Sequence, residues 1–242
     1  MPDPGTGPDA GTGVLITRPE PGASETAARL VDLGFRPVVA PVLEIHALPC
    51  RLAAAGRLQA TVVASGNAIR PLLAEFHRLP LFAVGEATAS RARAAGFTQV
   101  CSADGDANAL AALVRRQAHP KAGPLLLATG RAQGHGLAAS LRSLGFRVIR
   151  RAVYAAEPVA TLPETALRSL AAGNVIAALF FSAETARHCV RLLRRAALHD
   201  AVNTVDALAI GRPCAVALQP LPWRRIRVAD RPTQDAMLAL LR

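Results

Sequence analysis

The residues of this chain that are best suited to bind a ligand stand where buried, strand-like segments end. They recur in two similar sets, one in each half of the sequence: Thr17, Arg18, Ser65, Gly66, Asn67, Gly85 and Thr88 in the first, and Thr129, Gly130, Arg131, Ser182, Ala183, Thr185, Gly211 and Cys214 in the second. Hydroxyl and guanidinium groups donate hydrogen bonds to anions, and glycine lets a ligand approach backbone N–H groups closely. The pattern therefore indicates two quasi-equivalent groups of binding loops.

These residues also have structural interpretations. The serines of both sets can be ordinary helix N-caps, and Gly85 and Gly211 can form tight turns between a strand and a helix. Arg18 and Arg131 can be solvated surface charges. The sequence contains no Ser/His/Asp set, carboxylate pair, Walker loop or GxGxxG motif. The sequence thus indicates binding loops but no recognisable set of catalytic residues.

An internal repeat supplies the elements that position both sets. Residues 14–42 and 125–153 each read as an apolar strand, an amphipathic helix closed by the letters LGFR, and a second apolar strand. Gly34 and Gly145 in these motifs fit the left-handed position that follows the end of a helix.

The repeat continues through the rest of both halves. Residues 61–73 and 178–193 each read as a buried strand that ends in serine and leads into a helix, and residues 81–97 match residues 207–221. Strands that alternate with helices indicate parallel sheets covered by helices, so the predicted class is α/β. In such sheets ligands sit beyond the carboxyl ends of the strands, where both sets are expected to lie.

Composition excludes several other classes of protein. With 242 residues, 51% of them hydrophobic and 19% charged, the chain has material for one large domain or two smaller ones, and is neither disordered nor collagen-like nor a disulfide scaffold. No apolar run approaches the roughly 18 residues that cross a bilayer. Residues 1–13 lack the features of a signal peptide, so we expect a flexible tail there and a cytoplasmic protein. The 4 cysteines and 6 histidines are scattered, which predicts reduced thiols and no metal site.

The net charge of +11 comes from 28 basic residues, among which Lys121 is the only lysine. Arginine suits the recognition of carboxylates and phosphates, so the charge favours an anionic partner. A coding bias toward arginine in a GC-rich genome explains the same composition. Aromatic residues make up 4% of the chain and do not interleave with the basic ones, which argues against nucleic-acid binding.

Several short motifs follow one another in an informative order: VLITRP, PVLEI, VVASGNAI, AVGEATA, LGF followed by AVYAA, FFSAET, AIG, and PTQDAMLALL. Together they make residues 14–242 resemble the uroporphyrinogen-III synthase family. The resemblance implies two similar parallel-sheet α/β domains, joined by a two-stranded β connection and with a cleft between them. It divides the chain into a discontinuous domain of residues 1–42 and 158–242, an inserted domain of residues 46–150, and connecting strands at 41–45 and 152–158.

The resemblance also implies a reaction. The family closes the linear tetrapyrrole hydroxymethylbilane to uroporphyrinogen III, with loss of water and inversion of ring D through a spiro intermediate, and it uses no cofactor. The substrate carries eight carboxylates, which would explain an arginine-rich chain. Because uncatalysed closure gives the type I isomer, the enzyme acts mainly by holding the substrate in a folded orientation.

Two residues carry specific expectations from this resemblance. Tyr154, the only tyrosine, matches a family tyrosine and could assist departure of the ring A hydroxyl, because a phenol is protonated at neutral pH. A packing role on a connecting strand is the alternative. Cys214 stands where the family usually has threonine, and a thiol is the weaker hydrogen-bond donor.

Two other functions remain open at this point. Two α/β lobes are also the plan of non-catalytic proteins that bind anionic small molecules, and a basic chain can bind nucleic acid. We expect instead a monomeric enzyme that acts on a small molecule and binds neither nucleic acid nor membrane.

Overall fold

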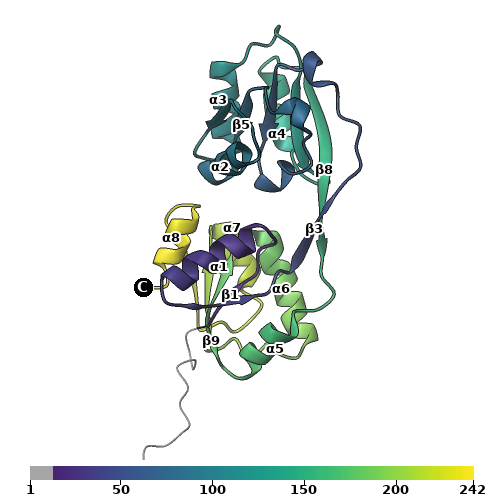
Figure 1. The fold of residues 1–242 in the computed structure, drawn as a ribbon. Coiled ribbons are helices and arrows are strands. Elements are labelled where there is room, and N and C mark those ends of the chain that lie inside the picture. Colours follow the sequence, from purple (N-terminus) through teal and green to yellow (C-terminus); the bar gives the residue numbers. More distant parts are fainter. Residues whose placement is uncertain (1–12) are drawn as a thin grey trace, which may run out of the picture. The chain divides into compact units, whose positions relative to one another are not determined.

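The computed structural model describes residues 13–242, which fold as two compact units (Figure 1). The first unit contains the described residues up to Glu44 together with Glu157–Arg242, and the second contains Ile45–Ala156. A strand begins at Gly13, so the tail predicted for residues 1–13 is one residue too long, and the rest of that prediction lies outside the described residues.

The first unit is built on a parallel sheet with the strand order β11-β10-β9-β1-β2. Its strands are β1 (Gly13–Ile16), β2 (Arg36–Val39), β9 (Val175–Phe180), β10 (Asp206–Ala209) and β11 (Arg225–Val228). Its helices are α1 (Gly22–Asp32), α5 (Glu164–Ala171), α6 (Ala183–Arg195), α7 (Arg212–Leu218) and α8 (Gln234–Ala239).

Helices cover both faces of this sheet (Figure 1). Val14 and Ile16 of β1 pack with Leu30 of α1 and Met237 of α8, and all four side chains are fully buried. Successive strand residues point to opposite faces, so Leu15 turns to the other side, where α6 packs on α7.

The second unit contains a sheet with the order β3-β8-β7-β4-β5-β6. Its strands are β4 (Ala60–Val63), β5 (Leu81–Ala83), β6 (Val100–Ser102), β7 (Leu125–Gly130) and the larger parts of β3 (Leu43–Ala47) and β8 (Val148–Pro158), whose two outermost residues each belong to the first unit. Its helices are α2 (Glu86–Ala94), α3 (Ala107–Gln117) and α4 (His135–Ser143). The pairs from β8 through β7, β4 and β5 to β6 are parallel.

The two sheets repeat one strand order. Along the sheet, β8-β7-β4-β5-β6 corresponds to β2-β1-β9-β10-β11. The segments that follow corresponding strands in the chain also correspond, for example α4 after β7 and α1 after β1. In chain order the first unit starts with its β1–α1–β2 part, whereas the second unit ends with the equivalent β7–α4–β8 part. The parallel α/β class and the duplication predicted from the sequence are confirmed.

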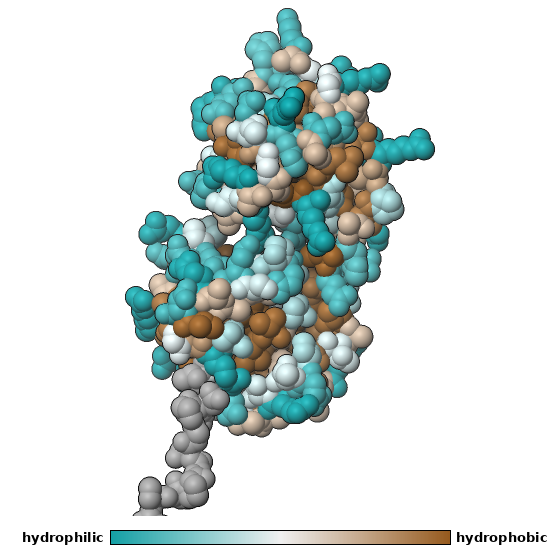
Figure 2. Space-filling view, viewed as in Figure 1, coloured by the Kyte–Doolittle hydropathy of each residue, from teal (hydrophilic) through white to brown (hydrophobic). Residues whose placement is uncertain are grey.

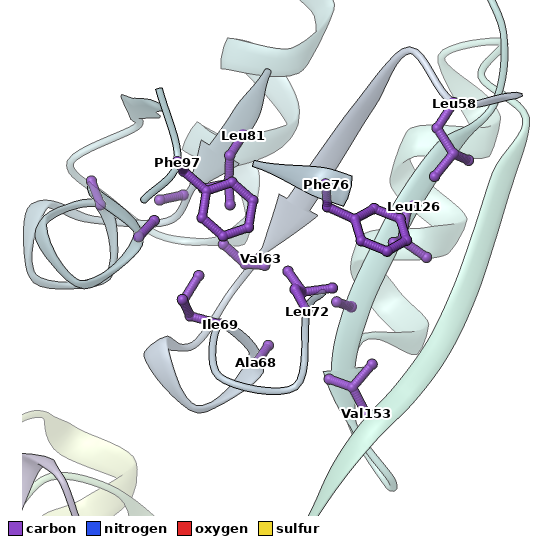
Figure 3. Close-up of a cluster of buried hydrophobic side chains, with 14 of the residues drawn as sticks. Leu58, Val63, Ala68, Ile69, Leu72, Phe76, Leu81, Phe97, Leu126 and Val153 are labelled. Carbon is purple, nitrogen blue, oxygen red and sulfur yellow. The ribbon is translucent and has the colours of Figure 1, made fainter. Parts of the chain in front are cut away.

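The second unit has one core on each side of its sheet. Leu110 and Val114 of α3 pack with Leu137 and Leu141 of α4 on one side. On the other side, the cluster shown in Figure 3 gathers side chains from strands β4, β5 and β7, from α2 and from the segment 55–76.

The helix predicted after Ser65 is wrong. Residues 66–68 and 74–76 form only short 3₁₀ turns, whereas the equivalent α6 is a regular helix. Pro71 explains the difference, because proline lacks an N–H, clashes with the preceding turn of an α-helix and disfavours helical backbone in the residue before it. Ile69, Leu72 and Phe76 still bury their side chains in the core (Figure 3).

The glycines of the two LGFR motifs end their helices as predicted. Gly34 and Gly145 have φ values of 81° and 88°, in the left-handed region. Phe35 N–H donates to Leu30 O at 2.9 Å, and Phe146 N–H donates to Leu141 O at 3.2 Å. These bonds satisfy carbonyls that the helix leaves unpaired and fix where the next strand begins.

A buried hydroxyl in β4 gives a first prediction. The Thr61 side chain is fully buried, and its Oγ1 has no hydrogen-bond partner within residues 13–242, whereas the equally buried Thr17 donates to Leu179 O at 2.7 Å. We expect Thr61→Val to stabilise the protein by about 1 kcal/mol, because an unsatisfied buried polar group is removed, and Thr17→Val to destabilise it by about 1 kcal/mol. Thermal unfolding of both variants measures this. Equal destabilisation by both would contradict it.

Figure 2 shows hydrophilic residues projecting from the surface of both units, in keeping with the 28 basic residues of the chain. None of the helices in the described part is long and apolar enough to cross a membrane.

Candidate functional site

In the first unit, parallel register brings the carboxyl ends of β1, β9 and β10 to one edge of the sheet. Ile210 N–H donates to Phe180 O at 3.0 Å, and Thr17 Oγ1 bonds Leu179 O, so the three strands end side by side. The predicted residues that this edge brings together are Thr17, Arg18, Ser182, Ala183, Thr185, Gly211 and Cys214.

Arg18 is held in a defined position at this edge. Its Cζ lies 4.2 Å from the centre of the Phe181 ring, and its Nη1 donates to Gln234 Oε1 at 2.9 Å. A Cβ at position 22 would lie 2.6 Å from the same Cζ, so Gly22 leaves the space that the guanidinium fills. An arginine ordered in this way binds an anion with less loss of side-chain entropy than a mobile surface arginine.

Cys214 points into the protein. Its side chain is 2% exposed, and its one S–H group has two acceptors within reach, Phe180 O at 3.4 Å and Ser182 O at 3.5 Å from Sγ. Burial raises the pKa of the thiol to about 11, so it is protonated at neutral pH and is not a nucleophile. The thiol therefore ties the start of α7, which follows β10, to the end of β9, a contact that a threonine hydroxyl could also make.

The serines of both sets cap their helical segments, as one of the two interpretations predicted. Ser182 Oγ accepts from Thr185 N–H at 3.1 Å and bonds the Thr185 hydroxyl, while Ser65 Oγ accepts from Asn67 N–H at 3.3 Å. Both caps shape loops at strand ends, so the structural role is present whether or not a ligand also contacts them.

In the second unit, the ends of β4, β5 and β7 form the corresponding edge. The predicted residues that it gathers are Ser65, Gly66, Asn67, Gly85, Thr88, Thr129, Gly130 and Arg131. The Thr129 hydroxyl accepts from Arg150 Nη1 at 3.3 Å, and Arg131 N–H donates to Tyr154 O at 2.9 Å.

Sequence reasoning missed a second arginine at this edge. Arg91 of α2 lies against the loop after β4: a Cβ placed on Gly66 would be only 2.5 Å from its Nη1. Arg91 follows Thr88 by about one helical turn, so the helix periodicity after Gly85 was the signal that could have found it. Gln234 and Phe181, which hold Arg18, were missed in the same way.

Gly85 and Gly211 do not need to be glycine for the sake of the fold. Their φ values of −158° and −177° are extended backbone that any residue adopts. No described heavy atom lies within 4 Å of a Cβ placed on Gly85, and a Cβ on Gly211 would meet only Pro213 Cδ, at 4.0 Å. The turn interpretation therefore does not explain these glycines, and both leave strand-end backbone uncovered.

Tyr154 lies beside the loop that follows β7. Its side chain is 2% exposed and belongs to the core cluster, and its hydroxyl donates to Gln133 Oε1 at 2.8 Å. A Cβ on Gly130 would lie 3.0 Å from Tyr154 Cζ, so the ring rests on the backbone of the β7 end. Tyr154 thus combines a packed ring with a hydroxyl beside the carboxyl end of β7.

A match to a protein family decides what these strand ends belong to. Residues 24–239 match the model of the family described as uroporphyrinogen-III synthase HemD. The chain belongs to the uroporphyrinogen-III synthase family. The resemblance inferred from the motifs is thereby confirmed, and so is the predicted activity, since uroporphyrinogen-III synthases are cyclising enzymes that act on a small tetrapyrrole.

Solved structures agree with this fold. A uroporphyrinogen-III synthetase from Helicobacter pylori has 15% identity and a TM-score of 0.63, with 94% of this chain and 97% of that one covered. A variant of the uroporphyrinogen-III synthase from Thermus thermophilus has 24% identity and a TM-score of 0.53, with 95% and 97% covered. No curated protein matches this chain. None of these findings supports the alternative of a non-catalytic protein that binds anionic small molecules.

Proposed function

We propose that this chain closes hydroxymethylbilane to uroporphyrinogen III. In this proposal the strand-end residues of the two units hold the substrate's carboxylates, and the Tyr154 hydroxyl is the acid that helps water to leave. The binding residues in this proposal are Arg18, Ser65, Gly66, Asn67, Gly85, Thr88, Thr129, Gly130, Arg131, Ser182, Ala183, Gly211 and Cys214. Cys214 would not contact the substrate itself. Its thiol faces inward and fixes the loop after β9, which would contact the substrate.

The open backbone at Gly85 and Gly211 is the observation that carries this proposal. Glycine with ordinary extended φ and no neighbour to clash with is not required by the fold. A bound ligand that approaches the backbone closely gives a reason for it, because a side chain there would keep the ligand away. The same feature recurs at equivalent strands in both units, as a substrate with many similar side chains would require.

Arginine side chains beside these loops suit a polycarboxylate. Arg18 lies at the edge of the first unit, and Arg91 and Arg150 lie at that of the second. Bidentate pairing between guanidinium and carboxylate groups fixes direction as well as distance, so several such contacts would restrict the chain of pyrroles to one folded arrangement. Holding reacting atoms in that arrangement accounts for most of the acceleration in reactions of this kind.

The role of Tyr154 follows from its chemistry. A phenol keeps its proton at neutral pH and can give it to a leaving hydroxyl group. Its hydroxyl already makes a hydrogen bond to Gln133 across the end of β7, in the loop region that would hold the substrate.

For partners, we infer a monomeric, cytoplasmic enzyme that binds a small linear tetrapyrrole and no nucleic acid. Strand-end loops with scattered arginines suit discrete carboxylates, whereas nucleic acid needs a continuous basic track with stacking aromatics. Gel filtration and a binding titration with duplex DNA at low salt would test both inferences.

Replacing Gly85 tests whether its open space is used. We expect Gly85→Leu to lower kcat/KM by about tenfold or more while the melting temperature stays within about 2 °C, because the new side chain enters space needed by the substrate rather than by the fold. Gly56→Leu is a matched control, since Gly56 also has open space around its Cβ position but lies in a 3₁₀ turn away from the strand ends. Equal activity of the two variants would argue against substrate at Gly85.

The function itself is tested by incubating purified protein with hydroxymethylbilane and separating the product isomers. Type III product is expected, at a rate that exhaustive dialysis against a chelator leaves unchanged. Product that matches the protein-free reaction would overturn the proposed function.

A further inference from the structure

Gln133 meets the Tyr154 hydroxyl from a loop that is anchored on both sides. It lies between β7 and α4, where its N–H donates to Gly130 O at 3.0 Å and its backbone oxygen accepts from Arg150 Nη1 at 2.8 Å. Its Oε1 accepts the Tyr154 hydroxyl hydrogen at 2.8 Å. The backbone of Gln133 is therefore fixed beside Tyr154 by contacts other than the bond that its carboxamide makes to the phenol.

Gly130 makes this meeting of side chains possible. A Cβ at this position would lie 3.0 Å from Tyr154 Cζ and 3.1 Å from Gln133 Oε1, closer than real Cβ atoms usually come. The absence of a side chain at Gly130 lets the phenol and the carboxamide share one space at the end of β7.

A carboxamide offers an acceptor and a donor that exchange places when the group rotates. A neutral phenol needs an acceptor for its hydrogen, whereas a phenolate needs a donor. We propose that Gln133 is a positioning residue for Tyr154, accepting the hydroxyl hydrogen at rest and turning its amide N–H toward the oxygen once Tyr154 has given up its proton. This inference rests on the proposed function.

Proton transfer from Tyr154 accompanies the loss of the ring A hydroxyl. The bond between the ring A methylene carbon and its hydroxyl oxygen breaks, and its electron pair leaves with the oxygen, which takes the phenol proton and departs as water. The pyrrole nitrogen lone pair supplies the electrons of the new exocyclic double bond, and Tyr154 is left as phenolate beside the Gln133 amide. The proton that a ring D carbon loses when the macrocycle closes returns to the phenolate.

Charged and titratable groups near this pair come from three elements. Arg150 is on the same strand as Tyr154, Arg131 is in the loop after β7, and His46 is on β3, which neighbours β8. Variants at position 133 leave these groups unchanged, so differences between the variants report on the carboxamide.

The sole tyrosine gives a direct readout of this contact without substrate. Labelling with 3,5-difluorotyrosine marks only position 154, and fluorine lowers the phenol pKa into a range that can be titrated by ¹⁹F NMR in the folded protein. If Gln133 only accepts from the neutral phenol, Gln133→Met should lower the phenol pKa, because the neutral form loses its hydrogen bond. We expect the pKa to rise instead, because the stronger, charge-assisted bond to the phenolate is lost. A lowered or unchanged pKa would overturn the inference.

Gln133→Glu tests the same change from hydrogen-bond acceptor to donor through the rate of the reaction. The ionised carboxylate still accepts the phenol hydrogen but cannot donate to a phenolate, so we expect kcat to fall about tenfold at pH 8, with KM changed less than about twofold. The deficit should shrink as pH falls, because the introduced carboxyl gains a proton and with it an O–H donor.

Gln99→Glu is the control, because Gln99 is exposed in the same unit and bonds Arg78 O through its side chain. A rate deficit for Gln133→Glu that is constant with pH, or no larger than that of the control, would overturn the inference. The wild-type product isomer is measured first. Failure to form type III product is a failure of the proposed function, whereas normal wild-type activity with unaffected variants at position 133 is a failure of this inference alone.

Discussion

Tyr154→Phe is expected to slow formation of the type III isomer by roughly ten- to a thousandfold, because it removes only the hydroxyl that would protonate the leaving oxygen. The ring stays in its place in the core, where Tyr154 is 2% exposed. Loss of the hydrogen bond to Gln133 should cost about 1 kcal/mol of stability, too little to unfold the enzyme. Single-turnover rates at saturating substrate measure the chemical step directly.

Thr98→Val is the matched control for the loss of a hydroxyl. Thr98 lies in the same unit, is exposed, and donates to His77 O at 3.2 Å away from the strand ends. If both variants keep the wild-type rate, Tyr154 is a packing residue and the acid must be a substrate carboxyl group or water. A lower melting temperature with an unchanged rate per folded molecule would lead to the same conclusion.

Cys214→Trp is expected to damage folding first and activity only as a consequence. Cys214 is 2% exposed and bonded to two strand-end carbonyls, so an indole would need space that the packed core lacks. Overpacking of this size should cost about 2–3 kcal/mol, and a chain of this length should then melt roughly 5–10 °C lower. Thermal unfolding and initial rates are measured on the same preparation.

Cys214→Thr supplies the comparison. A threonine hydroxyl can donate to the same carbonyls, so activity should stay within about threefold of wild type, a difference under about 0.7 kcal/mol. A tryptophan variant that melts normally but is inactive would place residue 214 against the substrate and contradict the inward orientation of its thiol.

Periodic patterns predicted most of the fold. The LGFR motifs identified two helix ends, because the left-handed backbone that follows them favours glycine, and both glycines adopt it. The repeat predicted two parallel sheets, and the strand order of the first recurs in five strands of the second. The pattern failed after Ser65, where apolar spacing suggested a helix although Pro71 prevents one. A single backbone constraint outweighed a correct hydrophobic pattern.

The candidate site was predicted less completely, for a physical reason. Backbone position follows from strand ends, so Gly85, Thr129 and Ser182 could be found from their place in the repeat. Arg91 and Gln133 reach the site with long side chains from a helix and a loop, and only three-dimensional packing brings them to Gly66 and Tyr154.

The isomer composition of the product at increasing protein concentration decides whether the chain directs ring closure. Starting from hydroxymethylbilane that closes spontaneously to type I, the type III fraction should rise with protein until almost all of the product is type III. A product that stays type I at every protein concentration, while the protein remains folded, would contradict the proposed function.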